Sequence, residues 1–416
     1  MDFELNFAKG KASFQLDESL LMGVLKPNEI AIESEGVEEV KKALKNPIGT
    51  GRLNEVLNPG ESVAIITSDI TRPMPSKVVL PSLLEELNEA GIEDEDIKII
   101  FALGSHRKHT EEEIKALVGD AVYDRIQCLD LDVEDCVELG KSRRGTPMNI
   151  YRPVVEADRR ICLGNIEYHY FAGYSGGSKA IMPGVATRDS IQANHSMMVL
   201  DEATTGSLDE NPLRQDIEEI TNFVSIDFIL NVVLNESKQI IKAVAGHHKE
   251  AHRAGCDFLD KLYKIELEEA ADLVIVSPGG YPKDINLYQA QKALDNAKHA
   301  VRDGGVIILV ASCKEGLGEG VFERWMLESV ESKDMITRIK QHFELGGHKA
   351  AAIALVLEKA DVYLVSDLED DFVRSIFLEP CPTVNAAVQK AKNKLGQNFR
   401  TILMPYGGST LPVVKG

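Results

Sequence analysis

The chain has 416 residues, of which 44% are hydrophobic and 27% are charged, and its formal net charge is −20 at pH 7. This length exceeds one ordinary hydrophobic core, so the sequence predicts two globular domains. The acidic balance and the absence of a Lys/Arg-rich run argue against nucleic acid as the main partner. No run of about 18 apolar residues occurs, and the first residues lack a signal-peptide pattern. We therefore expect a cytoplasmic protein without a membrane span.

The cysteines favour a reducing compartment. They number six and form no C-x-x-C pair, which argues against a structural zinc site. Their positions are scattered: Cys128, Cys136, Cys162, Cys256, Cys313 and Cys381. The sequence therefore predicts reduced thiols.

The first half of the chain alternates apolar strand patterns with amphipathic helix patterns. Strands are predicted over 61–67 and 97–103. A helix is predicted from Pro73 to Gly91, and Thr110 with Glu113 forms the capping box of a second helix. This order predicts a mostly parallel sheet covered by helices, with ligand-facing loops after the strands.

The second half repeats the pattern. Strands are predicted over 272–277, 306–310 and 362–365, with a helix over 286–301. We expect an N-terminal cofactor-binding domain over 1–267 and a C-terminal substrate-closing domain over 268–401, joined through the acidic segment 262–270. The segment 402–416 either closes the second sheet or returns to the first domain. The fold class is two α/β domains with mostly parallel sheets and an interdomain active-site cleft.

A glycine-rich turn is the most informative local feature. It consists of Gly173, Ser175, Gly176, Gly177 and Ser178, directly before Lys179. Such a turn can bring backbone N–H groups close to a phosphate, although its spacing matches neither a dinucleotide fingerprint nor a P-loop. Lys179 is a candidate point charge for phosphate or a candidate for covalent linkage; the alternative is a solvated helix-start lysine.

Three histidines are candidates for chemistry. His195 lies on a predicted helix without a second histidine at i+4, so it is either a packing residue or one ligand of a metal held mainly by other groups. His106 and His169 follow strands and suit an acid–base pair, unless each is a buried structural histidine.

Two further groups have the chemistry of substrate contacts. Arg72 follows a strand and suits a carboxylate or phosphate, the alternative being an ion pair with Asp69. Gln289 and Lys292, beside Tyr288, share one helix face, which is otherwise typical of a solvated surface.

Taken together, these motifs resemble the nickel-pincer lactate racemase family. The matching segments are Ser-Asp-Ile-Thr-Arg-Pro at 68–73, Gly-Ser-His-Arg at 104–107, His169 with the turn at 173–179, His195, and Tyr-Gln-Ala-Gln-Lys at 288–292. The resemblance implies nickel held by a pincer nucleotide, pyridinium-3-thioamide-5-thiocarboxylic acid mononucleotide. It also implies cofactor-maturation enzymes as partners and a small 2-hydroxy acid as substrate.

The resemblance implies a role for each candidate. His195 corresponds to the nickel ligand and Lys179 to the lysine joined to the cofactor. His106 and His169 correspond to the acid–base pair. The substrate-binding set is Arg72, Tyr288, Gln289, Lys292 and Lys349; the cofactor-binding set adds Asp69, Thr71, Gly173, Ser175, Gly176, Gly177 and Ser178 to Lys179. The implied reaction is racemisation or epimerisation by proton-coupled hydride transfer to the cofactor.

The sequence departs from the family pattern at a tryptophan. Lactate racemases place a Trp near the substrate, whereas the single Trp here, Trp325, has a packing pattern. Gly347, His348 and Lys349 are candidates for a polar wall instead, so we expect a substrate larger or more polar than lactate. The alternative is that Gly347 only begins a helix.

Two other functions stay open at this point. One is a nicotinamide-dependent α/β oxidoreductase, although no glycine fingerprint follows the first strand. The other is a non-catalytic ligand-binding member of the fold.

Overall fold

The chain folds into two compact units. The computed structural model describes residues 1–235 and 237–415. The central unit comprises residues 30–260, and the terminal unit comprises residues 1–29 together with 261–415. This division differs from the predicted boundaries, because the first 29 residues belong with the C-terminal part. The reason is a hairpin that buries Leu5 and Phe14 in the core of the terminal unit.

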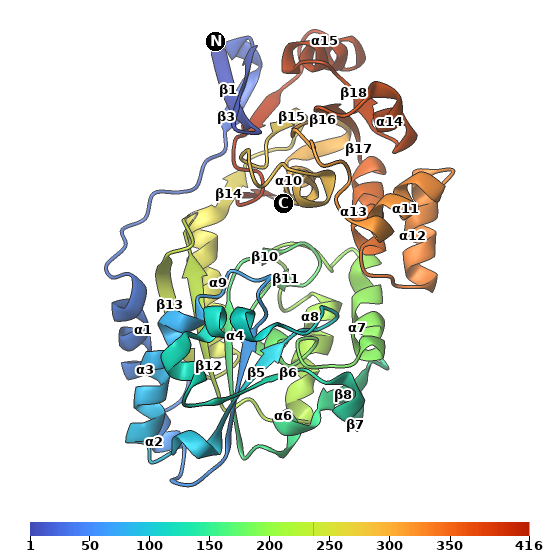
Figure 1. Ribbon diagram of the computed structural model, residues 1–416. Helices are drawn as coiled ribbons and strands as arrows, with labels where there is room; N and C mark the ends of the chain where they lie inside the picture. Colours follow the sequence, from blue (N-terminus) through green and yellow to red (C-terminus); the bar gives the residue numbers. More distant parts are fainter. Residues whose placement is uncertain (236, 416) are drawn as a thin grey trace. The chain divides into compact units, whose positions relative to one another are not determined.

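The central unit is built on a six-stranded sheet in the order β13-β12-β9-β4-β5-β6 (Figure 1). Its strands are β4 (Val63–Ser68), β5 (Ile97–Ala102), β6 (Gln127–Asp130), β9 (Arg159–Asn165), β12 (Phe228–Leu234) and β13 (Ile240–Gly246). All neighbours pair in parallel except β12 and β13. Strands β4, β9 and β12 are almost continuously buried, which is typical of parallel strands covered on both faces.

Helices and two short ribbons complete the central unit. They are α1 (Gly36–Lys45), α2 (Leu53–Val56), α3 (Ser76–Glu89), α4 (Glu111–Val118), α5 (Asp120–Tyr123), α6 (Arg152–Glu156), α7 (Arg188–His195), α8 (Pro212–Glu218) and α9 (Glu250–Tyr263), with the ribbons β7 (Cys136–Lys141)–β8 (Pro147–Tyr151) and β10 (Tyr168–His169)–β11 (Gly173–Tyr174). Helix α1 packs against β13 and α3. The predicted capping box is confirmed, since Thr110 and Glu113 cap α4 reciprocally.

The terminal unit has a second six-stranded sheet, in the order β18-β17-β16-β15-β19-β3. Its strands, all parallel, are β3 (Leu21–Val24), β15 (Ala271–Val276), β16 (Val301–Val310), β17 (Ala360–Val365), β18 (Glu379–Pro380) and β19 (Thr401–Met404). The last predicted strand therefore closes this sheet and does not return to the other unit. The predicted junction segment contains a strand, β14 (Lys264–Leu267), which pairs with β20 (Leu411–Val414).

Alternate residues of this second sheet face two different layers. Leu273 and Ile275 lie in one core with the hairpin β1 (Asp2–Phe7)–β2 (Gly10–Gln15) and with α15 (Val384–Leu395). Val276 points to the other face, where α10 (Leu287–Ala297) packs against β15 and β16. The remaining helices are α11 (Gly320–Glu328), α12 (Ser332–Gln341), α13 (Gly347–Leu357) and α14 (Asp370–Ser375).

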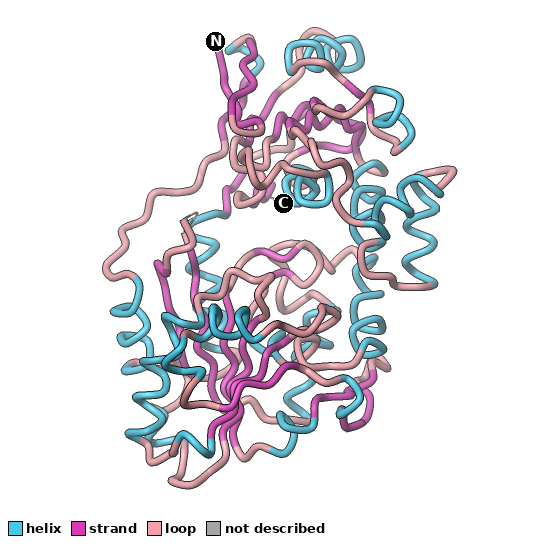
Figure 2. The backbone as a smooth tube through the Cα atoms, viewed as in Figure 1, coloured by secondary structure: helices cyan, strands magenta, loops and turns pink. Residues whose placement is uncertain are grey.

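Figure 2 shows the strands of each unit gathered between its own helices, as the predicted α/β fold class requires. The six cysteines are free thiols. Within the described part of the chain, no helix combines the length and the apolar character needed to cross a membrane.

Candidate active site

The loops after β4 and β5 meet through a carboxylate and a histidine. The Nδ1 atom of His106 lies 2.5 Å from Oδ2 of Asp69. The same carboxylate accepts a hydrogen bond from the Thr71 hydroxyl through its other oxygen at 2.8 Å. Burial raises the pKa of Asp69, but the hydrogen bond and charge of His106, together with Thr71 and Arg72, hold it below its usual value. A charged Asp69 fixes the ring proton of His106 on Nδ1.

Arg72 lies exposed in the same loop. Its charge contributes to lowering the pKa of both Asp69 and Lys179, so its guanidinium lies close enough to influence both groups. The predicted alternative, an ion pair that ties Arg72 to Asp69, is not among the contacts of the described residues, because Asp69 bonds His106 and Thr71. The fork of Arg72 is therefore in a position to bind an anion.

His169 lies on the short ribbon β10–β11, which two tyrosines anchor. The hydroxyls of Tyr168 and Tyr174 both donate to Oδ1 of Asp260, at 2.9 and 2.6 Å. Burial and the charge of Asp260 raise the pKa of both phenols, so they remain donors. The Nδ1 atom of His169 accepts a hydrogen bond from the Ala172 N–H at 3.3 Å. In the neutral ring the proton then sits on Nε2.

The ring of Phe171 connects His169 with His195. It contacts His169 edge-on at 4.4 Å and His195 edge-on at 4.8 Å between ring centroids. Two histidines that the sequence separates by 26 positions therefore share one aromatic neighbour. The sequence shows no direct signal for this contact.

His195 ends α7 and is oriented by a buried amide. Its Nδ1 lies 3.1 Å from Oδ1 of Asn194. The amide nitrogen of Asn194 donates to Asp216 at 2.8 Å and to the Leu213 carbonyl at 3.2 Å, so its oxygen is the acceptor. His195 Nδ1 must therefore donate, and the neutral ring carries its lone pair on Nε2. This is the tautomer of a metal-binding histidine with an outer hydrogen-bond partner.

Asp216 is a buried carboxylate that accepts several hydrogen bonds around Asn194. It also accepts hydrogen bonds from the hydroxyls of Ser142 and of Thr146, the latter at 2.7 Å. Buried carboxylates need such donors, since an unpaired one is costly. Neither Asn194 nor Asp216 was singled out from the sequence, where only the position of Asn194 beside His195 hinted at it.

Two buried side chains, Arg214 and His252, donate hydrogen bonds to the carbonyls of the glycine-rich turn. Arg214 donates to the carbonyls of Tyr174 at 3.3 Å and Gly176 at 3.4 Å. Nε2 of His252 donates to the carbonyl between them, that of Ser175, at 2.8 Å. Burial and the neighbouring Arg214 charge keep the pKa of His252 well below its usual value, so the ring is neutral.

The glycines of this turn are required by packing within the protein. A Cβ on Gly173 would lie 1.8 Å from the Ser207 carbonyl, and one on Gly176 would lie 2.8 Å from the Asn231 side chain. A Cβ on Gly177 would approach His252 to 3.0 Å. All three also have positive φ, which glycine adopts without strain. The Ser175 hydroxyl is used internally, donating to the Asn165 carbonyl at 2.7 Å.

Lys179 follows the turn, and its amine has an unusual ionisation. Burial, with the charges of Arg72 and Arg214, lowers the pKa of Lys179 to about 7. A substantial fraction of this amine is therefore neutral at physiological pH, which suits a nucleophile that becomes covalently linked. This property distinguishes Lys179 from a solvated helix-start lysine.

Three predicted substrate residues of the terminal unit, Tyr288, Gln289 and Lys292, lie on α10. Asn286 caps this helix, accepting from the Gln289 N–H at 3.0 Å. Gln289 and Lys292 are both exposed, in agreement with their i, i+3 spacing on one helix face. The opposite face of the helix, which includes Ala290 and Ala293, is buried. The side chains of Gln289 and Lys292 are therefore available to a ligand.

Lys349 is buried and engaged within the terminal unit. Its Nζ donates to the Tyr288 carbonyl at 2.6 Å and lies 4.0 Å from the centre of the Tyr288 ring. Trp325 is fully buried, and its indole N–H donates to Glu344 at 2.8 Å, in agreement with a packing role. His348 lies near the start of α13, where its Nδ1 accepts from the Gly346 N–H at 2.9 Å.

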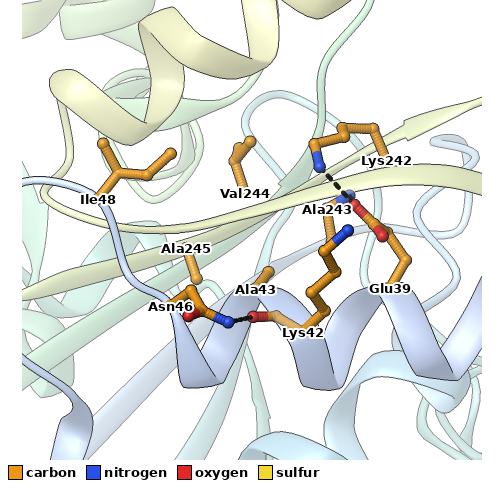
Figure 3. Close-up of a pocket in the computed structure, with 9 residues that line it drawn as sticks. All are labelled: Glu39, Lys42, Ala43, Asn46, Ile48, Lys242, Ala243, Val244 and Ala245. Carbon is orange, nitrogen blue, oxygen red and sulfur yellow. Dashed lines mark hydrogen bonds and ion pairs between the residues drawn. The ribbon is translucent and has the colours of Figure 1, made fainter. Parts of the chain in front are cut away.

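The described residues contain no metal cluster, and a pocket among them lies away from the predicted site residues. Among residues 1–235 and 237–415, no group of three or more His, Cys, Asp or Glu side chains is arranged to hold a metal. A pocket of about 250 Å³ lies between α1 and β13 (Figure 3). Its lining includes the Lys242–Glu39 ion pair at 2.6 Å and none of the predicted site residues, so it is separate from them.

Family models match most of the chain. The model of the lactate racemase N-terminal domain matches residues 7–206, and that of the lactate racemase C-terminal domain matches residues 267–411. The chain belongs to the lactate racemase family. The predicted family is thus confirmed, and with it the prediction of an isomerase of the racemase type.

The sequence similarity to two lactate racemases extends over nearly the whole chain. The lactate racemase of Thermoanaerobacterium thermosaccharolyticum is 34% identical over 422 residues, covering 99% of each chain. That of Lactiplantibacillus plantarum is 33% identical, covering 97% of this chain and 98% of the relative.

Solved structures give the same result for the fold. The lactate racemase apoprotein from T. thermosaccharolyticum superposes with a TM-score of 0.90 at 34% identity, with both chains covered completely. A Thermotoga maritima protein superposes with a TM-score of 0.63 at 20% identity over 91% of this chain and 98% of its own, which shows a shared fold alone.

Proposed function

We propose that this racemase interconverts the configurations of a 2-hydroxy acid by proton-coupled hydride transfer, with a nickel-pincer nucleotide as cofactor. The observation that carries the proposal is the complementary state of two histidines. Nδ1 of His106 donates to Asp69, so its Nε2 has a lone pair that can accept a proton, whereas Nδ1 of His169 accepts from Ala172, so its Nε2–H can donate a hydrogen bond to a substrate oxygen. A racemase needs one base and one acid that exchange roles between the two directions.

The residues present fit the proposed cofactor. The Lys179 amine has the nucleophilic character required for a covalent link, and His195 has the tautomer required of a single protein ligand to nickel. Held by these residues, the nickel-pincer nucleotide would supply a reversible hydride acceptor. The turn residues Gly173–Ser178, with Asp69 and Thr71, are proposed to lie near its nucleotide part.

The proton steps belong to the protein. His106 removes the hydroxyl proton of one enantiomer, and the resulting cation is stabilised by the Asp69 carboxylate. When the opposite configuration is formed, the imidazolium form of His169 supplies a proton to the carbonyl oxygen and becomes the neutral ring, and proton exchange with solvent resets both histidines. The reverse reaction uses the same two nitrogens with their roles exchanged.

The substrate is proposed to be held by its carboxylate. Arg72 offers a planar fork that suits a carboxylate, and Lys292 and Gln289 offer exposed donors on α10. Tyr288 and Lys349 belong to the same predicted set. Because the Lys349 amine bonds the Tyr288 carbonyl, we propose that Lys349 acts through Tyr288. We also propose that the substrate is larger or more polar than lactate.

Intact mass and metal analysis of protein produced together with cofactor-maturation enzymes tests this proposal. We expect a covalent adduct at Lys179, nickel near one per chain, and interconversion of the enantiomers of at least one 2-hydroxy acid. Protein from such cells that carries neither adduct nor nickel would contradict the cofactor assignment. Loaded protein that interconverts no member of a panel of lactate, malate and aldonates would contradict the reaction.

A further inference from the structure

A fourth histidine, His109, is hydrogen-bonded at both ring nitrogens and its side chain is only 1% exposed. Its Nδ1 lies 2.7 Å from Oδ1 of Asp130, the last residue of β6. The other oxygen of Asp130 accepts from the His109 backbone N–H at 2.7 Å. The Phe101 ring packs on the imidazole with 5.1 Å between centroids. The position and orientation of the ring are therefore fixed.

The second ring nitrogen of His109 supports a neighbouring loop. Its Nε2 accepts a hydrogen bond from the Ile70 backbone N–H at 3.1 Å. Since Oδ1 of Asp130 accepts the hydrogen bond of Nδ1–H, Nε2 carries the lone pair that the contact with Ile70 needs. Only this neutral tautomer satisfies both neighbours, because a proton on Nε2 would face the Ile70 N–H.

Ile70 lies at the centre of the loop that carries three proposed site residues. Asp69 precedes it, and Thr71 and Arg72 follow it. His106 lies three positions before His109 in the loop after β5. The His109 ring thus connects the loop after β4, the loop after β5 and the end of β6. The Asp69–His106 contact depends on the relative placement of the first two.

We propose that His109, held by Asp130, is a positioning residue that sets the loop 69–72 against His106 and thereby aligns Arg72 and the Asp69–His106 pair for catalysis. His109 itself touches neither substrate nor cofactor in this proposal. The catalytic relevance rests on the proposed function, whereas the loop-holding role is a property of the protein alone. Misplacement of such a pair by about 1 Å typically costs on the order of a hundredfold in rate.

Two substitutions at His109 separate its two hydrogen bonds. In His109→Gln the amide oxygen reaches the position of Nε2 and can still accept from Ile70. In His109→Asn the shorter amide can still donate to Asp130 but leaves the Ile70 N–H without an acceptor. Asp132→Asn is the matched control, because Asp132 follows the same strand but forms a half-exposed ion pair with Lys108 at 3.3 Å.

The first readout is hydrogen–deuterium exchange at the Ile70 amide of the cofactor-free protein, resolved by fragmentation of the peptide that contains it. We expect exchange to accelerate at least about tenfold in His109→Asn and to stay near wild type in His109→Gln and Asp132→Asn. Equal protection in all four proteins would overturn the loop-holding role. Thermal unfolding of each variant identifies a global loss of stability, and Asp130→Asn then provides a second route to the same contact.

The second readout is racemisation by matured enzyme with measured nickel and adduct content. We expect kcat to fall about tenfold to a hundredfold in His109→Asn with the Lys179 adduct and nickel unchanged, and to recover in His109→Gln. Accelerated exchange with an unchanged kcat would overturn the positioning role. A wild-type enzyme that is loaded but inactive on every 2-hydroxy acid would instead contradict the proposed function, while the exchange experiment would still decide the role of His109.

Discussion

His106 and His169 carry their ring protons on opposite nitrogens, the first on Nδ1 against Asp69 and the second on Nε2 because Nδ1 accepts from Ala172. Before substrate arrives, the pair therefore offers one lone pair that can accept a proton and one N–H that can donate a hydrogen bond. Ionisable side chains of this kind contribute roughly 10²–10⁴-fold each when they transfer a proton in the transition state.

The first prediction separates the two histidines by direction. His106→Ala and His169→Ala should each lower enantiomer interconversion by about 10²–10⁴-fold, with the Lys179 adduct intact. In rapid-quench single turnovers, each variant should form bound 2-oxo acid from only one enantiomer, and the two variants should use opposite enantiomers. Formation from both enantiomers by either variant would remove that histidine from the pair.

The second prediction concerns the carboxylate that orients His106. Asp69→Asn should lower kcat by at least about tenfold, because an amide no longer fixes the Nδ1 proton or stabilises the imidazolium. The pKa of Asp69 is held below its usual value, so its contribution to stability is present above the unfolded-state pKa and is lost as pH falls through the lowered one. The difference in melting temperature from wild type should therefore be largest near neutral pH and shrink in strong acid. A difference that grows with acidity would contradict the assignment.

The third prediction concerns the Lys179 amine. With a pKa of about 7, it should react with acetic anhydride in cofactor-free protein at pH 7 far faster than surface lysines, whose pKa lies near 10.5. Peptide mass spectrometry across pH 5–10 should give half-maximal reactivity close to pH 7. Lys292, exposed on α10, is a suitable internal control. A midpoint near 10 for Lys179 would show that its amine is an ordinary one.

Local patterns predicted the elements and their order, because each depends on neighbours in sequence. The capping box at Thr110 and the buried strand β4 are examples. The boundary failed at the N-terminus, since an amphipathic hairpin such as Asp2–Gln15 does not reveal which core it covers.

In the candidate site, too, local features could be predicted from the sequence and contacts between distant segments could not. The strand-end position of His106 and the spacing of Gln289 and Lys292 are local features and were predicted. The rest depends on distant segments: Asp216 orients the Asn194 amide that sets the His195 tautomer, and burial with the charges of Arg72 and Arg214 sets the ionisation of Lys179. The glycines of the turn were explained by a phosphate in the sequence analysis, whereas packing against the protein itself requires them.

The fourth prediction tests the buried partners of His195. Asn194→Ala removes the acceptor of the Nδ1 proton, so the ring loses its fixed orientation. Loss of such outer partners typically weakens metal binding by about 10–100-fold. We expect matured Asn194→Ala to release nickel correspondingly faster to a chelator, measured by metal analysis over time. Asn149→Ala, a substitution of a half-buried asparagine in the same unit, serves as the control, and equal release from both variants would exclude a specific role.

The fifth prediction decides how Lys349 acts. Its amine bonds the Tyr288 carbonyl at 2.6 Å and lies over the Tyr288 ring, so a direct contact with substrate and a contact through Tyr288 have different consequences. If Lys349 supports Tyr288, Lys349→Met should lower kcat/KM for lactate, malate and aldonates by a similar factor of roughly ten, as a misplaced binding residue would. If Lys349 forms a cationic wall, malate and aldonates should lose more than lactate, since they carry the additional polar groups. Lys292→Met, which removes an exposed donor, should weaken every substrate through KM. Unchanged kcat/KM for all substrates in Lys349→Met would contradict both roles and leave the Lys349–Tyr288 contact as packing.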